Sequence, residues 1–153
     1  MPSGTVHAAC SLSLAVPCFA FAYGISGNHL PTAAACALGC VLGIPLTPDL
    51  DQEGLNSSEH AIIKWTFGLG FVWVMLWYPY ARLCKHRSPL SHWPLLGTLG
   101  RLLYMTIFVG IAVALGWKMP LLPTALLSWG LAGLALSDGA HWLLDSTLGD
   151  RRR

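Results

Sequence analysis

Residues 121–145 read LLPTALLSWGLAGLALSDGAHWLLD, an apolar run that ends in a group of polar residues. A helix of this length can cross the roughly 30 Å hydrocarbon layer of a bilayer. Asp138, His141 and Asp145 are separated by three and four residues, so they share one face of such a helix. The stretch therefore predicts a membrane helix that carries a polar stripe near its C-terminal end.

The chain as a whole has the composition of a membrane protein. Its 153 residues are 54% hydrophobic and only 10% charged, with a mean hydropathy of +0.56. A soluble domain of this size needs more charge on its surface, whereas helices in lipid leave their outer faces apolar. The composition predicts a single all-α domain over residues 1–153, built as a polytopic bundle of membrane helices.

Four further apolar segments precede the last one, at residues 8–25, 32–46, 61–80 and 95–117. Hydropathy alone slightly favours five crossings. The segment at 61–80, however, carries Lys64 among several Trp and Tyr residues, a mixture typical of the membrane interface. We therefore expect about four transmembrane helices and one interfacial or re-entrant aromatic-rich helix.

The four-crossing arrangement puts both termini and the loops at 47–58 and 82–94 on one side of the membrane. Eight of the nine Lys and Arg residues then lie on that side, and only Lys118 lies opposite. The positive-inside rule makes this side cytoplasmic. Membrane lipids are the expected partners, since Lys85 and Arg87 suit anionic headgroups.

Composition also argues against two other kinds of site. The net charge is only +2, and the basic residues are not interleaved with aromatic residues on a polar face, so no nucleic-acid partner is expected. The five Cys residues include no CxxC pair. They are expected to pack as small apolar side chains rather than to hold zinc as thiolates.

The scarce imidazoles and carboxylates gather at the predicted cytoplasmic face. Four of the six His and four of the seven acidic residues are the candidate ligands: His7, Asp49, Asp51, His86, His92, Asp138, His141 and Asp145. Mixed nitrogen and oxygen ligation suits zinc first, with manganese or iron as alternatives. The set exceeds what a single zinc ion needs, which predicts one or two divalent ions.

Each part of this set also has an interpretation without metal. The acidic turn at 48–51 could simply end a helix, and the loop at 86–92 could bind lipid headgroups. Asp145 could belong to a solvated last helical turn. His29 and His60 are expected to be solvated and to have no part in a site.

Several of these residues lie in short motifs that resemble a bacterial family of metal-binding integral membrane proteins of unknown function. That family is itself similar to YdjM-like inner-membrane proteins, which are described as metal-dependent hydrolases. The motifs are Pro2-Ser3-Gly4 before His7, Pro48 to Asp51, His86 to His92 followed by Gly97 and Thr98, and His141 with Asp145. Their anchor residues run from Ser3 to Asp145, so the resemblance covers nearly the whole chain.

The resemblance implies an inner-membrane protein with a metal site built from His7, Asp49, Asp51, His86, His92, His141 and Asp145. Asp138 matches the family pattern less clearly. The segment at 52–71 departs from that pattern, which expects more basic residues there.

Two functions fit these residues. One is a metal-dependent hydrolase that acts on a phosphoester or lipid headgroup, with Asp51 as general base and Arg87 holding the anionic substrate. The alternative is a non-catalytic protein in which metal ties helix ends together for membrane assembly or partner docking. A transporter is disfavoured, because ionisable residues on a transport path lie near the bilayer midplane.

Overall fold

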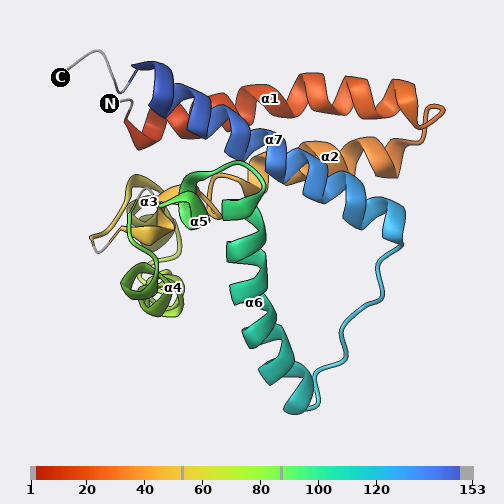
Figure 1. Ribbon diagram of the computed structural model, residues 1–153. Helices are drawn as coiled ribbons and strands as arrows, with labels where there is room; N and C mark the ends of the chain where they lie inside the picture. The colour runs from red at the N-terminus through yellow and green to blue at the C-terminus, as the bar shows by residue number, and fades with distance from the viewer. Residues whose placement is uncertain (1–2, 53, 87, 149–153) are drawn as a thin grey trace.

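The computed structural model describes residues 3–52, 54–86 and 88–148 (Figure 1). This part of the chain contains helices and no strands, so the predicted all-α class is confirmed there. The elements are α1 (Gly4–Ile25), α2 (Leu30–Leu42), the 3-10 helix η1 (Pro48–Asp51), α3 (Ser57–Trp65), α4 (Phe71–Leu83), α5 (Pro89–His92), α6 (Leu96–Ala114) and α7 (Thr124–Leu148).

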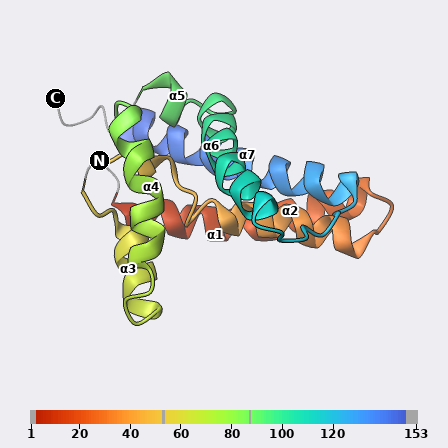
Figure 2. The same cartoon turned by 90° about the horizontal axis from the view of Figure 1, so that it is seen from below.

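Helices α1, α2 and α7 pack side by side and form the main body of the molecule (Figures 1 and 2). Glycines let α2 and α7 approach closely. A Cβ added to Gly39 would lie 2.0 Å from the carbonyl oxygen of Gly130, and one added to Gly133 would lie 2.0 Å from that of Cys36. Small residues allow such helix contacts in membranes, where backbones can approach closely. The buried core here is Cys18, Ala22, Ala33, Cys36 and Cys40.

This close contact makes α7 sensitive to added volume at Gly133. Replacing Gly133 with Ala is expected to lower the free energy of unfolding by about 1–3 kcal/mol, because the new methyl group must push the two backbones apart. Gly139→Ala is the control in the same helix, since its Cβ would meet no atom within 4 Å. Thermal unfolding in detergent should show a lower midpoint for Gly133→Ala alone, and equal midpoints would contradict the predicted contact.

The short elements η1, α3, α4 and α5 gather beneath the end of the main body that holds both chain termini (Figure 1). Leu50 from η1 packs against Trp77 and Tyr80 from α4 to form a second buried core. Tyr104 from α6 extends this core, and its hydroxyl donates a 2.6 Å hydrogen bond to the carbonyl of Leu76. The aromatic residues thus hold η1 in place beside α4 and α6.

Helix α6 leaves the main body at a steep angle, and residues 115–123 bring the chain back to α7 (Figure 1). Its buried residues are Gly97, Thr98 and Arg101, all near its first turns. Beyond these turns it exposes large apolar side chains such as Leu103 and Ile107, which are 71% and 55% exposed. Lipid is a better environment than water for this surface.

Two of the described helices, α1 and α6, are long and apolar enough to cross a bilayer. Helix α2 is also apolar but has only 13 residues. These features are compatible with association with a membrane. The expected four crossings, and the interfacial position of the segment at 61–80, stay predictions.

The predicted continuous helix at 61–80 is wrong, because α3 ends at Trp65 and α4 begins at Phe71. Phe67 and Gly68 adopt positive φ angles of 52° and 92°, which no α-helix contains. The Thr66 hydroxyl closes the turn, since it donates to the carbonyl of Ile62 and accepts from the backbone N–H of Gly70, both at 2.7 Å. The helix predicted at 32–46 likewise ends earlier, at residue 42, and the last helix begins after Pro123.

Candidate metal centre

Histidines and carboxylates from distant parts of the sequence meet at the end of the main body near both termini (Figure 1). We call this set the His/Asp cluster; it comprises His7 of α1, Asp49 and Asp51 of η1, His86 of the loop after α4, His92 of α5, and His141 and Asp145 of α7. Among the described residues, three overlapping groups could each hold an ion: His7–His141–Asp145, Asp49–His92–His141 and Asp51–His86–His92. Within each group the candidate ligand atoms lie within 4.8 Å of one another.

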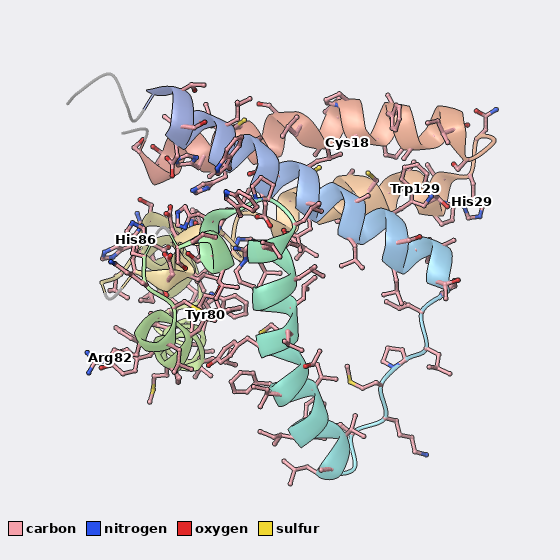
Figure 3. The ribbon with its side chains drawn as sticks, viewed as in Figure 1. Cys18, His29, Tyr80, Arg82, His86 and Trp129 are labelled. Atoms are coloured by element: carbon pink, nitrogen blue, oxygen red, sulfur yellow. The ribbon has the colours of Figure 1, made fainter. Side chains whose placement is uncertain are left out.

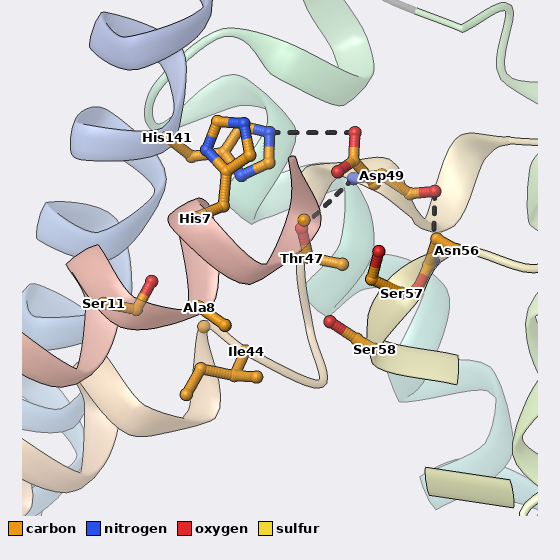
Figure 4. A pocket seen from close by; sticks show the side chains of 12 residues that line it. His7, Ala8, Ser11, Ile44, Thr47, Asp49, Asn56, Ser57, Ser58 and His141 are labelled. Atoms are coloured by element: carbon orange, nitrogen blue, oxygen red, sulfur yellow. Dashed lines mark hydrogen bonds and ion pairs between the residues drawn. The ribbon is translucent and has the colours of Figure 1, made fainter. Parts of the chain in front are cut away.

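In the first group, His7 of α1 and His141 of α7 lie against each other (Figure 4). The rings of His7 and His141 stack with their centroids 3.7 Å apart. Oδ1 of Asp145 lies 3.2 Å from Nε2 of His7, and its Oδ2 lies 3.6 Å from Nε2 of His141. One helical turn away, Ser11 and Ser137 share a 2.7 Å hydrogen bond, which holds α1 and α7 in this register.

Helix η1 brings Asp49 to the centre of the His/Asp cluster. Thr47 is extended, and Pro48 then begins a 3-10 turn that carries the two carboxylates. Proline suits the first turn of a helix because it has no N–H to satisfy. The Thr47 hydroxyl accepts from the N–H of Asp49, and the Asn56 side chain donates to the Asp49 carbonyl at 3.3 Å (Figure 4). As a result, Oδ1 of Asp49 lies 3.7 Å from Nε2 of His141.

Helix α5 places His92 between two carboxylates. Its Nε2 lies 3.6 Å from Oδ1 of Asp49, and its Nδ1 lies 3.3 Å from Oδ2 of Asp51. His86 completes this side of the cluster, with its Nδ1 2.7 Å from Oδ1 of Asp51. The side chain of Asp51 therefore faces two imidazoles.

These contacts shift the pKa values of the groups around His92. Burial by itself lowers the pKa of His92, but its close contacts with the carboxylates of Asp49 and Asp51 outweigh burial and raise that pKa to about 9. Burial raises the pKa of both aspartates, and contact with His92 reverses this, so both pKa values lie below the usual range. The carboxylates are ionised at neutral pH and ready to bind a cation.

Four buried polar atoms of the cluster have no hydrogen-bond partner: Nδ1 of His7, Nε2 of His92, Nε2 of His141 and Oδ1 of Asp145. A buried polar atom without a partner costs about 1–3 kcal/mol, so such atoms are rare in folded proteins. A divalent ion would satisfy at least the atoms that face the cluster interior. Imidazole nitrogens and carboxylate oxygens also match the donor set of zinc, manganese and iron. The residues present therefore fit a metal centre.

Asp138 takes a different place from the one predicted. Its carboxylate accepts hydrogen bonds from the Arg101 guanidinium and the Thr98 hydroxyl of α6, and it belongs to none of the three groups. Arg101 also donates a 3.0 Å hydrogen bond to the carbonyl of Ser91, next to His92. Asp138 thus acts as a counterion that fixes α6 against α7, and we leave it out of the candidate ligands.

Two other residues of the sequence analysis lie away from the cluster, and one lies outside the described residues. His29 is at the opposite end of the molecule from His86 (Figure 3), and its Nδ1 lies 2.6 Å from the Thr32 hydroxyl. His60 is exposed on α3. Arg87, predicted to hold substrate, is outside the part of the chain that the structure describes.

The role of Arg101 was not predicted from the sequence, where this residue enters only the count of basic residues. The signal was present: Arg101 is the one charged residue in the apolar segment at 95–117. An ionisable residue in such a segment nearly always faces the protein interior and has a partner. Asp138 is the matching acid in the last apolar segment.

Comparison with known proteins supports metal binding. A family model described as an uncharacterized metal-binding protein (DUF2227) matches residues 2–131. No curated protein and no solved structure matches the chain. The predicted resemblance to a metal-binding family of unknown function is confirmed, whereas the similarity to YdjM-like proteins stays a prediction. The matched region contains the cluster members from His7 to His92. His141 and Asp145 lie in α7, C-terminal to the matched region.

Proposed function

This chain belongs to the family of uncharacterized metal-binding proteins, and from that premise we propose that the His/Asp cluster holds two divalent ions and hydrolyses phosphoesters. The observation that carries the proposal is the set of buried, unpartnered ligand atoms that converge beside two open cavities. The ligand atoms account for metal binding, and the cavities provide room for a substrate.

Two ions follow from how the three groups overlap. A histidine ordinarily gives one ring nitrogen to one ion, with the other nitrogen bonded to an orienting partner. The groups His7–His141–Asp145 and Asp51–His86–His92 have no member in common. Asp49 lies between them, with Oδ1 within 3.7 Å of Nε2 of both His92 and His141. Asp49 would therefore serve as a ligand beside either group, with zinc as the first candidate metal and manganese or iron as alternatives.

Divalent ions at these positions would lower the pKa of water toward about 7 and polarise a phosphoryl oxygen. Asp145 lines both open cavities, so this candidate ligand lies at the side of the cluster that a substrate could reach. Asp51, the general base predicted from the sequence, faces His86 and His92 and lines neither of these cavities. We therefore assign Asp51 to metal binding, and the substrate role of Arg87 stays a prediction.

The alternative is a non-catalytic centre that ties α1, η1, α5 and α7 together. The burial of His7, His92 and His141, each no more than 7% exposed, favours this alternative. Structural metal sites are closed, however, whereas catalytic sites keep an open position. The two cavities beside Asp145, of about 190 and 280 Å³, favour hydrolysis.

The experiment that tests the proposal combines metal analysis with a hydrolysis assay. The purified protein is loaded with zinc, manganese or iron, its metal content is measured by elemental mass spectrometry, and bis(p-nitrophenyl) phosphate is the substrate. We expect about two ions per chain and metal-dependent hydrolysis; Asp145→Asn, which replaces a candidate ligand, should weaken metal binding and slow hydrolysis by about 10–100-fold. Two bound ions without hydrolysis of phosphomonoesters or phosphodiesters would favour the non-catalytic alternative. Failure to bind metal would reject both functions.

Metal binding should depend on pH through His92. Because its pKa is about 9, the ring carries a proton at pH 7 that a metal ion must displace. The apparent metal affinity is therefore expected to rise by up to about tenfold per pH unit between pH 7 and 9, and to level off above pH 9. Calorimetry in buffers of different ionisation enthalpy should detect at least one proton released per chain at pH 7. The same heat in every buffer would contradict this prediction.

We also propose that the protein lies in the bacterial inner membrane, with both termini and the His/Asp cluster on the cytoplasmic side. The apolar helices α1 and α6 and the distribution of Lys and Arg support this placement. A C-terminal fusion to a fluorescent protein should be bright, and a fusion to alkaline phosphatase should be inactive. The opposite pair of results would reverse the orientation.

A further inference from the structure

Two cavities of different character lie on either side of Asp145. The first, of about 190 Å³, is bordered mainly by polar residues, among them His7, Asp49, Gln52, Asn56 and Ser57. The second, of about 280 Å³, is lined by Ser88, Pro89, His92, Trp93, Trp142, Asp145 and Ser146. Two candidate metal ligands, His92 and Asp145, therefore line the same cavity as the indole rings of Trp93 and Trp142.

The two tryptophans owe their positions to the neighbouring histidines. Trp93 directly follows His92, and Trp142 directly follows His141. Trp142 lies beside His141 within α7, where consecutive side chains point in different directions, whereas Trp93 follows the last residue of α5, where the backbone becomes extended. Trp93 is 54% exposed and Trp142 is 39% exposed, which leaves both rings accessible from the cavity.

Exposed apolar residues also lie close in sequence to the two tryptophans. Leu90 lies three residues before Trp93 and Leu143 directly follows Trp142, and both leucines are exposed. Exposed Trp side chains that line a cavity are typical of a surface that meets lipid or an apolar ligand. The apolar surface is continuous with the His/Asp cluster through His92 and Asp145, which line the same cavity.

We propose that the cavity between Trp93 and Trp142 holds the hydrocarbon chain of the substrate, so that the substrate is an amphiphilic phosphoester of the lipid class. The phosphoester group would lie at the His/Asp cluster, and the chain would leave past the two indoles. This inference rests on the proposed hydrolase function and specifies its substrate. In this assignment Trp93 and Trp142 determine specificity and take no part in bond cleavage.

The test compares two non-hydrolysable ligands that share one headgroup, methylphosphonate and hexylphosphonate. Each methylene removed from water strengthens binding by about fourfold, so burial of only two methylenes gives more than tenfold. We expect the metal-loaded protein to bind hexylphosphonate at least about tenfold more tightly than methylphosphonate. Trp142→Ala should reduce this ratio to about threefold or less, without changing metal content or methylphosphonate affinity.

Trp117→Ala is the matched control, because Trp117 is an exposed tryptophan that lines neither cavity. All affinities are measured in the same detergent, so partition of the hexyl chain affects every variant equally. If Trp142→Ala loses metal, Trp93→Ala takes its place.

The outcomes separate this inference from the function on which it rests. Metal-dependent binding of methylphosphonate without a gain from the hexyl chain would overturn the inference and leave the hydrolase proposal intact. If hexylphosphonate still binds at least about tenfold more tightly than methylphosphonate in both Trp142→Ala and Trp93→Ala, the hydrocarbon chain lies elsewhere. That result would also overturn the inference. If neither phosphonate binds in a metal-dependent way, both proposals fail.

Discussion

Replacing His141 with alanine is expected to lower the metal content from about two ions per chain to one or none. His141 belongs to two of the three candidate groups and is only 5% exposed, so no other side chain or bulk water can easily take its place. Loss of a residue that merely orients a ligand typically weakens metal binding by 10–100-fold. Loss of His141 itself should weaken binding by at least about 100-fold, measured by competition with a chromogenic chelator and by elemental mass spectrometry.

His29→Ala is the matched control for this experiment. His29 lies at the other end of the molecule and contacts Thr32, so its loss should leave metal content and affinity unchanged (Figure 3). His92→Ala should behave like His141→Ala, because His92 also belongs to two groups. Retention of two tightly bound ions in both variants would show that the metal, if present, is held elsewhere.

Replacing Arg101 with methionine is expected to lower the free energy of unfolding by about 3–5 kcal/mol. Arg101 and Asp138 are each 2% exposed, and they pair directly between α6 and α7. Removal of one partner leaves a charge buried without compensation, which costs far more than the net value of the pair. The measurement is chemical unfolding in detergent micelles, followed by tryptophan fluorescence.

The double variant Arg101→Met with Asp138→Leu should recover most of this loss, because it removes both charges and keeps apolar volume. Lys118→Met is a control at an exposed position and should unfold like the wild type. Arg101 also holds the carbonyl of Ser91 beside His92, so both Arg101 variants should bind metal about 10–100-fold more weakly. A single variant as stable as the control would contradict the importance of this pair.

The family match and the helical class were both accessible from the sequence. Composition and long apolar segments predicted an all-α chain, and the scarcity of His and Asp singled out the residues of the cluster. Periodicity is local information, however, so it predicted helices better than their ends. The turn at 66–70 depends on the Thr66 hydroxyl and on positive φ angles at Phe67 and Gly68, and hydropathy does not detect either.

The sequence by itself determined which candidate metal ligands this protein carries and which segments are apolar, because residue types and hydropathy are local properties. Only the tertiary structure decided which polar residues meet. It paired Asp138 with Arg101, 37 positions away, and it set Asp49 between His92 and His141. It also opened the cavity beside Trp93 and Trp142. These pairings depend on how whole helices pack. A carboxylate buried in an apolar interior is costly unless it is paired, so it pairs with the cation that packing places next to it.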